Sequence, residues 1–259
     1  MKTSIKKILS IVLLNLIVWS GFAQEQKNWL SISFGTVIPS NDFKGKVFMD
    51  SILRCGFAKP GFGLNITYTN QLSNNFGLTV MAAGNTNSSN VTALQKELDN
   101  LVKGDIEIGE NSSGEASFGR WMTGMLLVGP NINFHLAHHF MLEIRGMLGV
   151  GMGQSPEYNY VITLAKPVEY INRIEFKQQS DHTLGFAWNV GLGLKYRFDR
   201  FFVRANFDYS GSHLKYDDVN FQIYKIFTNS ETPDYINRTS KLWIQTDIMQ
   251  ITGGIGYLF

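Results

Sequence analysis

Residues 186–198 read FAWNVGLGLKYRF, and this stretch decides the fold. Every even position from Phe186 to Phe198 is apolar or aromatic, whereas the odd positions hold Ala, Asn, Gly, Lys and Arg. Successive side chains of a β-strand point to opposite faces of the sheet, so a two-residue period predicts a strand. The stretch is therefore predicted to be a strand with one apolar face and one small or polar face.

The same alternation recurs along the chain and predicts eight strands. They are expected over residues 30–35, 62–69, 76–82, 122–135, 140–152, 186–198, 203–209 and 249–259. Most approach the 9–11 residues that a tilted membrane strand needs. Beyond the first 23 residues, no apolar run is long enough for a membrane-spanning helix, so any insertion into a bilayer would use strands.

The connections between these strands alternate in length. Short turns at 71–75, 136–139 and 199–200 alternate with long connections at about 39–58, 87–118, 155–183 and 213–242. Soluble domains usually have short loops at both ends, whereas outer-membrane barrels have short periplasmic turns and long external loops. The sequence therefore predicts an all-β fold, one antiparallel up-and-down transmembrane barrel of eight strands.

A barrel of ten strands is the alternative. It would add residues 158–164 and 170–176, which also alternate. Each run has only about seven residues, and Arg173, Glu175 and Lys177 occupy the opposite face of the second. We therefore expect eight strands, with these two runs and the alternating residues 219–227 extending the barrel strands beyond the membrane.

With this pattern the chain resembles the small outer-membrane β-barrel family, namely the OmpA transmembrane domain and the OmpX-like proteins of Gram-negative bacteria. The resemblance covers residues 28–259. The carboxyl end alternates through Ile251 and Gly253 and finishes on phenylalanine. The resemblance implies that Ile255, Tyr257 and Phe259 form the signal read by the barrel-assembly machinery, and that outer-membrane lipid surrounds the barrel.

A soluble lipocalin-like barrel would instead turn its apolar face inward around a ligand. The glycine, asparagine and charged residues of the polar face favour a polar interior, and the aromatic residues gather near both strand ends, as at two bilayer interfaces. The turn-end girdle is predicted to hold Phe76, Phe134, Phe140, Phe198, Phe201, Tyr257 and Phe259, and the loop-end girdle Trp121, Trp188, Tyr209 and Trp243.

Residues 1–23 have the pattern of a secretory signal peptide. Three lysines precede an apolar run, and Gly21 and Ala23 supply the small residues of a cleavage site. Cleavage after Ala23 would leave residues 24–259 as a single domain exported to the cell outer membrane. The net charge would then fall from +2 to about −1, because 20 basic residues would face 21 acidic ones. This balance predicts no nucleic-acid partner, and the lone Cys55 excludes an internal disulfide.

Charged residues on the polar face predict what fills the barrel. An eight-stranded barrel is just wide enough for side chains, and unpaired charges in so narrow a lumen are costly. We expect an ion network that plugs the lumen, with Asn189 beside it; the alternative is a gated ion path. The predicted network consists of Glu143, Arg145, Lys195, Arg197, Arg204 and Asp208.

The long loops are the predicted contact surface. Ser89 and Asn90 precede a leucine stripe from Leu94 to Val102, which predicts a short capped helix. Extended aromatic runs above the bilayer suit binding by strand addition. We expect a structural or adhesive role, with an envelope or extracellular protein partner at 87–118, 155–183 or 213–242. The alternatives are a narrow porin-like conduit for small solutes and a lipid-modifying enzyme.

No catalytic, cofactor-binding or metal-binding residues are predicted, and no cofactor is expected. Ser212 and His213 are adjacent, and neighbours on a strand face opposite sides, so they cannot form a nucleophile-base pair. The other residues considered for an acyl-transfer site are Ser210, Asp217, Asp218, Asp181 and His182. A turn with His135, His138 and His139 shows no further metal ligand.

Overall fold

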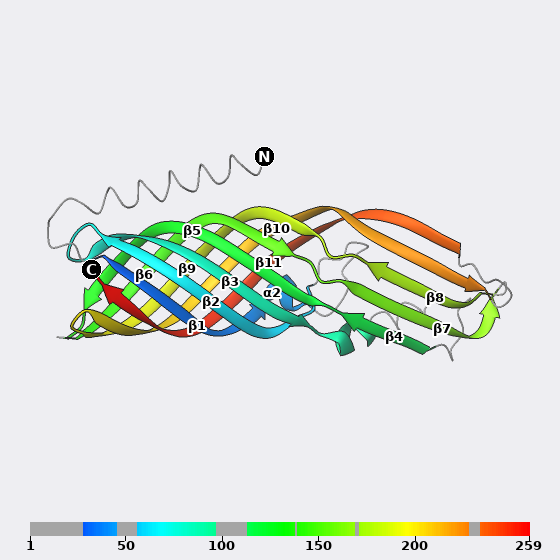
Figure 1. The fold of residues 1–259 in the computed structure, drawn as a ribbon, viewed down its shortest axis with the longest axis horizontal. Coiled ribbons are helices and arrows are strands. Elements are labelled where there is room, and N and C mark those ends of the chain that lie inside the picture. The colour runs from blue at the N-terminus through cyan, green and yellow to red at the C-terminus, as the bar shows by residue number, and fades with distance from the viewer. Residues whose placement is uncertain (1–27, 46–55, 97–112, 138, 169–170, 228–233) are drawn as a thin grey trace.

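The computed structural model describes residues 28–45, 56–96, 113–137, 139–168, 171–227 and 234–259 (Figure 1). The predicted signal peptide, Cys55, His138 and most of the predicted leucine-stripe helix lie outside these ranges. The signal peptide and the single domain over 24–259 therefore stay predictions. No helix in the described ranges is long and apolar enough to cross a membrane.

Eight strands form a closed ring. They are β1 (Trp29–Ser40), β2 (Ala58–Gln71), β3 (Phe76–Ser89), β5 (Arg120–His135), β6 (Phe140–Gln154), β9 (His182–Phe198), β10 (Phe201–Phe227) and β11 (Asp234–Leu258). Each strand pairs antiparallel with the next, and β11 pairs with both β10 and β1, so the ring has no open edge (Figure 1). The predicted eight-stranded barrel is confirmed.

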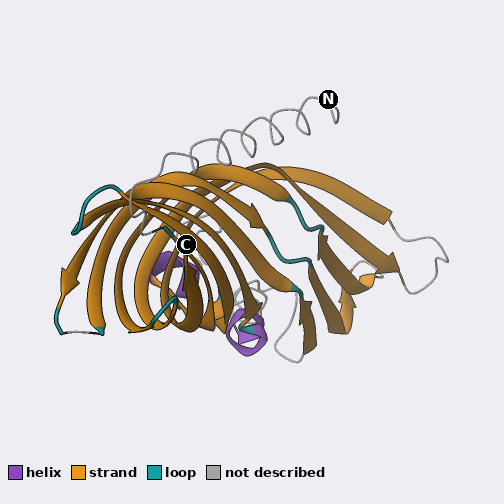
Figure 2. Cartoon of the chain, turned by 60° about the vertical axis from the view of Figure 1, so that its left-hand side comes forward, coloured by secondary structure: helices purple, strands orange, loops and turns teal. Residues whose placement is uncertain are grey.

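Three further strands lie outside the ring. β4 (Ser113–Phe118), β7 (Tyr158–Val168) and β8 (Ile171–Gln178) continue the sheet from the far half of β10 in the order β10-β8-β7-β4. Figure 2 shows this ribbon extending beyond the loop end of the barrel. The ten-strand alternative is therefore wrong, because both extra runs belong to this extension.

The alternating residues 219–227 extend a barrel strand as predicted, so the 213–242 connection is not a loop for most of its length. β10 and β11 stay paired through it, from His213↔Gln245 to Lys225↔Asp234. The register shifts between Tyr216 and Val219, where β10 has an extra residue. Such a bulge moves the alternation by one position, so a strict two-residue count loses the strand there.

The wall separates an apolar outer surface from a polar lumen. The exposed side chains include Leu30, Ile32 and Phe34 on β1, Leu64 and Ile66 on β2, Leu78 on β3, Leu126, Val128 and Ile132 on β5, Ile144, Leu148 and Val150 on β6, Val190, Leu192 and Leu194 on β9, Val203 and Phe207 on β10, and Ile251 and Ile255 on β11. Monomeric soluble proteins rarely expose so large a continuous apolar area. This is the surface arrangement of a membrane barrel.

The turn-end aromatic girdle is exposed on the outer wall, with Phe201 61% and Phe140 42% exposed. The loop-end girdle was predicted less accurately. Trp121 is fully buried in the lumen, where its Nε1 donates a hydrogen bond of 2.7 Å to the backbone oxygen of Gly56. The reason is phase: on β5 the even positions face outward, and Trp121 is an odd one. The side chain of Trp243 lies outside the described residues.

Two short helical segments lie at the loop end. α2 (Asn41–Lys44) follows β1 directly. Residues 91–96 are helical, and Asn90 Oδ1 accepts a hydrogen bond of 3.3 Å from the backbone nitrogen of Ala93. This is the N-cap that the sequence predicts. The three predicted short turns, at 71–75, 136–139 and 199–200, join consecutive strands at the opposite end.

Candidate functional site

The charged cluster in the lumen comes from three neighbouring strands. Glu143 and Arg145 lie on β6, Lys195 lies on β9, and Arg204 and Asp208 lie on β10. All five occupy inward positions of their strands, and none is more than 4% exposed. Because β6, β9 and β10 are adjacent in the ring, their side chains meet at one level of the lumen.

Glu143 is the centre of this cluster. Its Oε1 accepts hydrogen bonds from Arg145 NH1 at 2.5 Å and from Arg204 NH2 at 3.0 Å, and its Oε2 accepts one from Lys195 Nζ. The carboxylate therefore contacts three cations at once. Charge-assisted hydrogen bonds of this kind are about twice as strong as neutral ones.

Arg145 joins this centre to a second carboxylate. Its NH2 donates to both oxygens of Asp208, at 2.7 and 2.8 Å, and its Nε donates to Oδ1 at 3.2 Å. Asn189 Nδ2 donates to the same Oδ1 at 3.2 Å and to Ser210 Oγ at 2.8 Å. Such a bidentate pair fixes both side chains in one geometry.

Three cations share two carboxylates, so one positive charge lacks an anionic partner within the cluster. Lys195 Nζ lies 3.8 Å from the ring centre of Trp29 and 5.7 Å from that of Phe202. A cation over an aromatic face is stabilised by the ring quadrupole, more strongly where water is excluded. The two rings close the turn end of the lumen beside the ion network and offset the excess charge.

Hydrogen bonds between uncharged side chains lie beside the charged cluster. Asn65 Nδ2 donates to Gln250 Oε1 at 3.0 Å, and Gln250 Nε2 donates to Asn85 Oδ1 at 2.6 Å. Asn206 Nδ2 donates to Thr252 Oγ1 at 3.0 Å. The two bonds of Gln250 connect β11 with β2 and β3, and Asn206 Nδ2 also donates to Ser33 Oγ on β1 at 3.3 Å, so these side chains bridge strands that are not neighbours in the ring.

An apolar layer closes the loop end. Phe43 of α2 is fully buried against Trp121, with ring centroids 5.5 Å apart. Trp121 in turn contacts Tyr216 at a centroid distance of 6.4 Å. Other buried members of this layer are Leu214, Ile244 and Ile248. The lumen of the described barrel is thus filled from the aromatic pair at the turn end to this layer.

α2 is attached to the wall by one side chain. Asn41 has a positive φ of 47°, a left-handed conformation that asparagine tolerates better than most residues. Its Nδ2 donates to Asp247 Oδ2 at 2.8 Å and to the Tyr209 hydroxyl at 3.1 Å. These contacts hold α2 in the position that places Phe43 in the lumen.

Arg197 does not join the ion network that the sequence predicts. It is exposed, and its Nε donates to the backbone oxygen of Asp199 at 2.8 Å. Arg197 lies next to the 199–200 turn, where water reaches the end of the lumen and solvates the guanidinium. Trp29, Phe202 and Phe43 also occupy the lumen and were not among the predicted residues. Trp29 and Phe202 stand at the inward phase of their strands, a signal that strict counting of β1 and β10 would have found.

The described side chains among those considered for catalysis do not assemble, and the side chains of Asp217 and Asp218 lie outside the described residues. Ser210 and Ser212 point into the lumen, where Ser212 Oγ contacts Thr246 Oγ1. His213 and His182 are exposed on the outer side. Among these described residues no serine lies against a histidine. Within the described ranges no group of three His, Cys, Asp or Glu residues could hold a metal ion.

A substitution at Gly191 would test how tightly the ion network in the lumen is packed. A Cβ at this position would lie 2.1 Å from Asp208 Oδ1 and 2.8 Å from Arg145 Nε. We expect Gly191→Ala to lower the free energy of unfolding by about 1–3 kcal/mol, because the ion pair must shift. The measurement is urea unfolding of the protein in lipid vesicles. Gly146→Ala is the matched control, since its Cβ would meet nothing within 4 Å; equal effects of the two substitutions would contradict the close packing.

Comparisons with known proteins found only distant structural similarities. No protein-family model matches the chain, and no curated protein sequence matches it. Among solved structures, Ail, the attachment invasion locus protein of Yersinia pestis, is 14% identical over 91% of this chain and 100% of its own, with a TM-score of 0.39. OprG from Pseudomonas aeruginosa is 13% identical over 90% of this chain and 96% of its own, with a TM-score of 0.36.

The outer membrane protease OmpT from Escherichia coli is 12% identical, covers 90% of this chain and 97% of its own, and has a TM-score of 0.43. Similarities this distant assign no activity. The fold therefore follows from the strand pairing and from the two surfaces of the wall. The chain is an eight-stranded antiparallel β-barrel that presents apolar side chains outward and buried polar and charged side chains inward.

Proposed function

We propose that the protein is an integral outer-membrane barrel that recognises another protein through the sheet beyond its loop end. The filled lumen is the observation that carries this proposal, because it leaves the external surface as the place for function. Residues 1–23 would direct export and be cleaved, and Ile255, Tyr257 and Phe259 would engage the assembly machinery. With the short turns in the periplasm, the β4-β7-β8-β10-β11 sheet lies outside the cell.

The two faces of this external sheet differ. One face holds Tyr160 and Ile162, which are buried, and it continues the inward face of the barrel. On the other face Glu175 forms ion pairs with Arg173 at 2.7 Å and with Lys177 at 3.0 Å. Burial raises the pKa of the Tyr158 phenol, so this hydroxyl stays neutral at the sheet.

β4 is the strand that suits recognition. Among the described strands it pairs only with β7, and Gln95 Nε2 of the 91–96 helix donates a hydrogen bond of 2.7 Å to its Gly114 carbonyl. The other backbone groups along its second edge are the ones proposed to bind a partner. Glu115 and Ser117 are exposed on it. An edge strand of this kind accepts an extended segment of a partner through main-chain hydrogen bonds. The proposed partner segment is therefore an extended stretch of an extracellular or envelope protein.

The other two candidate functions have less support. A porin-like conduit needs an open path, whereas ion pairs, hydrogen bonds between non-neighbouring strands and the Phe43 layer occupy the described lumen. A lipid-modifying enzyme needs a nucleophile beside a base, and the described rim serines have none. Steady single-channel currents from the purified protein in a planar bilayer would contradict the filled lumen.

Site-specific photo-crosslinking in intact cells tests the recognition surface. A photoreactive amino acid at Glu115 or Ser117 is expected to give a discrete protein adduct, because both side chains flank the exposed edge of β4. Lys59, which is exposed at the loop end of β2 away from this edge, is the matched control position. Adducts of equal yield at all three positions, or none at β4, would contradict recognition at this strand.

A further inference from the structure

We propose that the outward face of the external sheet binds the core oligosaccharide of lipopolysaccharide, an acidic sugar chain that stands on the outer leaflet beside the barrel. The binding surface lies on β7, β8, β10 and β11, and it is separate from the β4 edge proposed for protein recognition. The inference rests on the proposed outer-membrane location, with the loop end of the barrel outside the cell.

The outward face of the external sheet continues the outer wall of the barrel. β10 stays paired with β11 on both sides of the bulge between Tyr216 and Val219. The extra residue moves the outward positions of β10 from odd to even numbers, so Gln222 and Tyr224 face the same side as His213 of the wall. Figure 1 shows the sheet extending along the axis of the barrel. This face therefore looks sideways over the membrane and not away from the cell.

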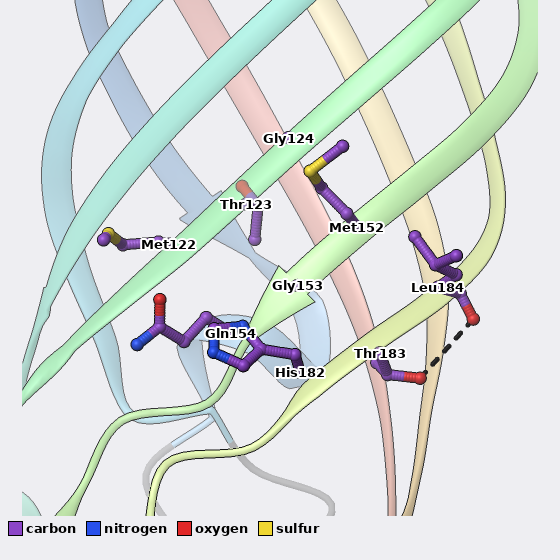
Figure 3. Close-up of a pocket in the computed structure, with 9 residues that line it drawn as sticks. All are labelled: Met122, Thr123, Gly124, Met152, Gly153, Gln154, His182, Thr183 and Leu184. Carbon is purple, nitrogen blue, oxygen red and sulfur yellow. Dashed lines mark hydrogen bonds between the residues drawn. The ribbon is translucent and has the colours of Figure 1, made fainter. Parts of the chain in front are cut away.

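The apolar wall ends below this face. Figure 3 shows where it ends on β6 and β9: Met152 and Leu184 pair in one exposed outward row, and Gln154 and His182 pair in the next row toward the loops. Lys177 precedes His182 by five residues, up to about 17 Å of strand at about 3.4 Å per residue. The sheet therefore rises past the level of the lipid chains into the layer that holds the sugars of the outer leaflet.

Hydrogen-bonding side chains form a row across four strands of this face. The strand register aligns Asn159, Lys177, Gln222 and Asn237, and all four are at least partly exposed. Neighbouring strands lie about 4.8 Å apart, so the row spans about 14 Å. Amide and ammonium groups placed in this way can hydrogen-bond the hydroxyl and phosphate oxygens of an oligosaccharide that lies across the strands.

The accessible charge in the centre of the face is positive. Arg173 and Lys177 share the carboxylate of Glu175, at 2.7 and 3.0 Å. The two cationic side chains are 46% and 43% exposed, whereas that of Glu175 is only 14% exposed. Glu115, the other exposed carboxylate described on this face, lies at its margin on β4. A phosphate or carboxylate on the sugar would therefore meet the cations first.

Tyr224 fixes the side chains in the middle of the row. Lys177 Nζ lies 4.9 Å from the centre of its ring, and its hydroxyl donates a hydrogen bond of 2.8 Å to Gln222 Oε1. These contacts orient the ammonium and the amide before a ligand arrives, which lowers the entropic cost of binding. The opposite face of the sheet differs, because Tyr160 and Ile162 are buried there.

The outward face is too polar for the centre of a protein interface. Such centres are usually apolar and poor in charged residues. Among the described side chains of this face, the apolar ones are Val161 and Ile226, and β8 with its charged residues lies between their strands. The polar row and the exposed cations thus favour an acidic sugar as the occupant.

Calorimetric titration of the purified protein with delipidated core oligosaccharide tests the binding. We expect Lys177→Met and Gln222→Leu each to weaken binding about tenfold, a difference of about 1.4 kcal/mol. Lys59→Met and Gln154→Leu are the matched controls, since Lys59 is exposed on β2 and Gln154 lies on the outer wall below the sheet. Absence of binding to the wild type, or equal losses in the controls, would overturn the assignment.

Removal of the phosphates from the oligosaccharide tests the role of the charge. The dephosphorylated sugar is expected to bind the wild type about fivefold more weakly, because its contact with the exposed cations is lost. The effect of Lys177→Met should shrink for this sugar, whereas the effect of Gln222→Leu should persist. Equal binding of the two sugars to the wild type would contradict an acidic ligand.

Photo-crosslinking in intact cells identifies the occupant. A photoreactive amino acid at Gln222 is expected to give an adduct that an antibody to the core oligosaccharide recognises. A protein adduct at Gln222 in its place would overturn the sugar assignment. A protein that does not insert into lipid vesicles contradicts the membrane location itself. A protein that inserts and gives a protein adduct at Glu115, but binds no oligosaccharide, contradicts this face alone.

Discussion

Glu143→Gln is expected to lower the free energy of unfolding by about 3–5 kcal/mol, the usual cost of breaking a buried ion pair from one side. The glutamine keeps the size of the side chain but removes the charge that faces Arg145, Lys195 and Arg204. Three cations would then share Asp208 alone in a lumen with little access to water. Removing their main counter-charge leaves buried positive charge uncompensated, which costs more than the ion pair contributes in the intact protein.

Urea unfolding of the barrel in lipid vesicles measures this effect. Glu115→Gln is the control, because Glu115 is exposed on β4 outside the ring, and it is expected to change stability by less than about 0.5 kcal/mol. The double variant Glu143→Gln, Lys195→Met removes one of the stranded cations. Its loss of stability should be smaller than the sum of the two single losses. A loss below about 1 kcal/mol for Glu143→Gln would contradict its central role.

Leu148→Arg is expected to destabilise the barrel by about 2–4 kcal/mol in vesicles, because it places a cation at the midplane of a bilayer. Leu148 pairs with Val128 halfway along the apolar wall, and both side chains face outward. Phe140→Arg introduces the same charge at the turn end of the same strand. There the headgroups and water solvate the guanidinium, so the expected cost is only about 0–1 kcal/mol.

The depth dependence is what distinguishes a membrane barrel from a soluble one. In a soluble barrel both positions would face water, and the two arginines would have similar, small effects. Unfolding in vesicles of the wild type and the two variants, under identical lipid composition, gives the comparison. Equal costs at Leu148 and Phe140 would contradict the bilayer as the environment of this wall.

Much of the fold was predictable because each barrel strand repeats a two-residue period. The eight strands and the three tight turns follow directly from that period and from the turn positions. The alternation of residues 219–227 predicted that β10 continues into the 213–242 connection, whereas its pairing with the first half of β11 was not predictable. A bulge at Tyr216 shifts the phase of β10, and the partner that stabilises the continued strand is β11, distant in the chain.

The contacts in the lumen were also predictable only in part. Alternation places Glu143, Arg145 and Lys195 on the inward face, and adjacent strands bring them close. Their actual partners depend on register and on depth along the barrel. Arg197 has the same phase as Lys195 but lies one pair of residues closer to the turn, where water replaces the network. Trp121 was assigned to the outer girdle by its place near a strand end, although its phase directs it inward.

The sequence by itself determined which side of each strand is apolar, and hence that the chain closes a barrel with a polar interior. That follows because the direction of a side chain on a strand depends only on its position in the chain. The tertiary structure alone decided which inward residues meet, where α2 places Phe43, and that β4, β7 and β8 form an external sheet. These features depend on strand order, stagger and bulges, which bring together residues that are distant in the chain and leave no local period to detect.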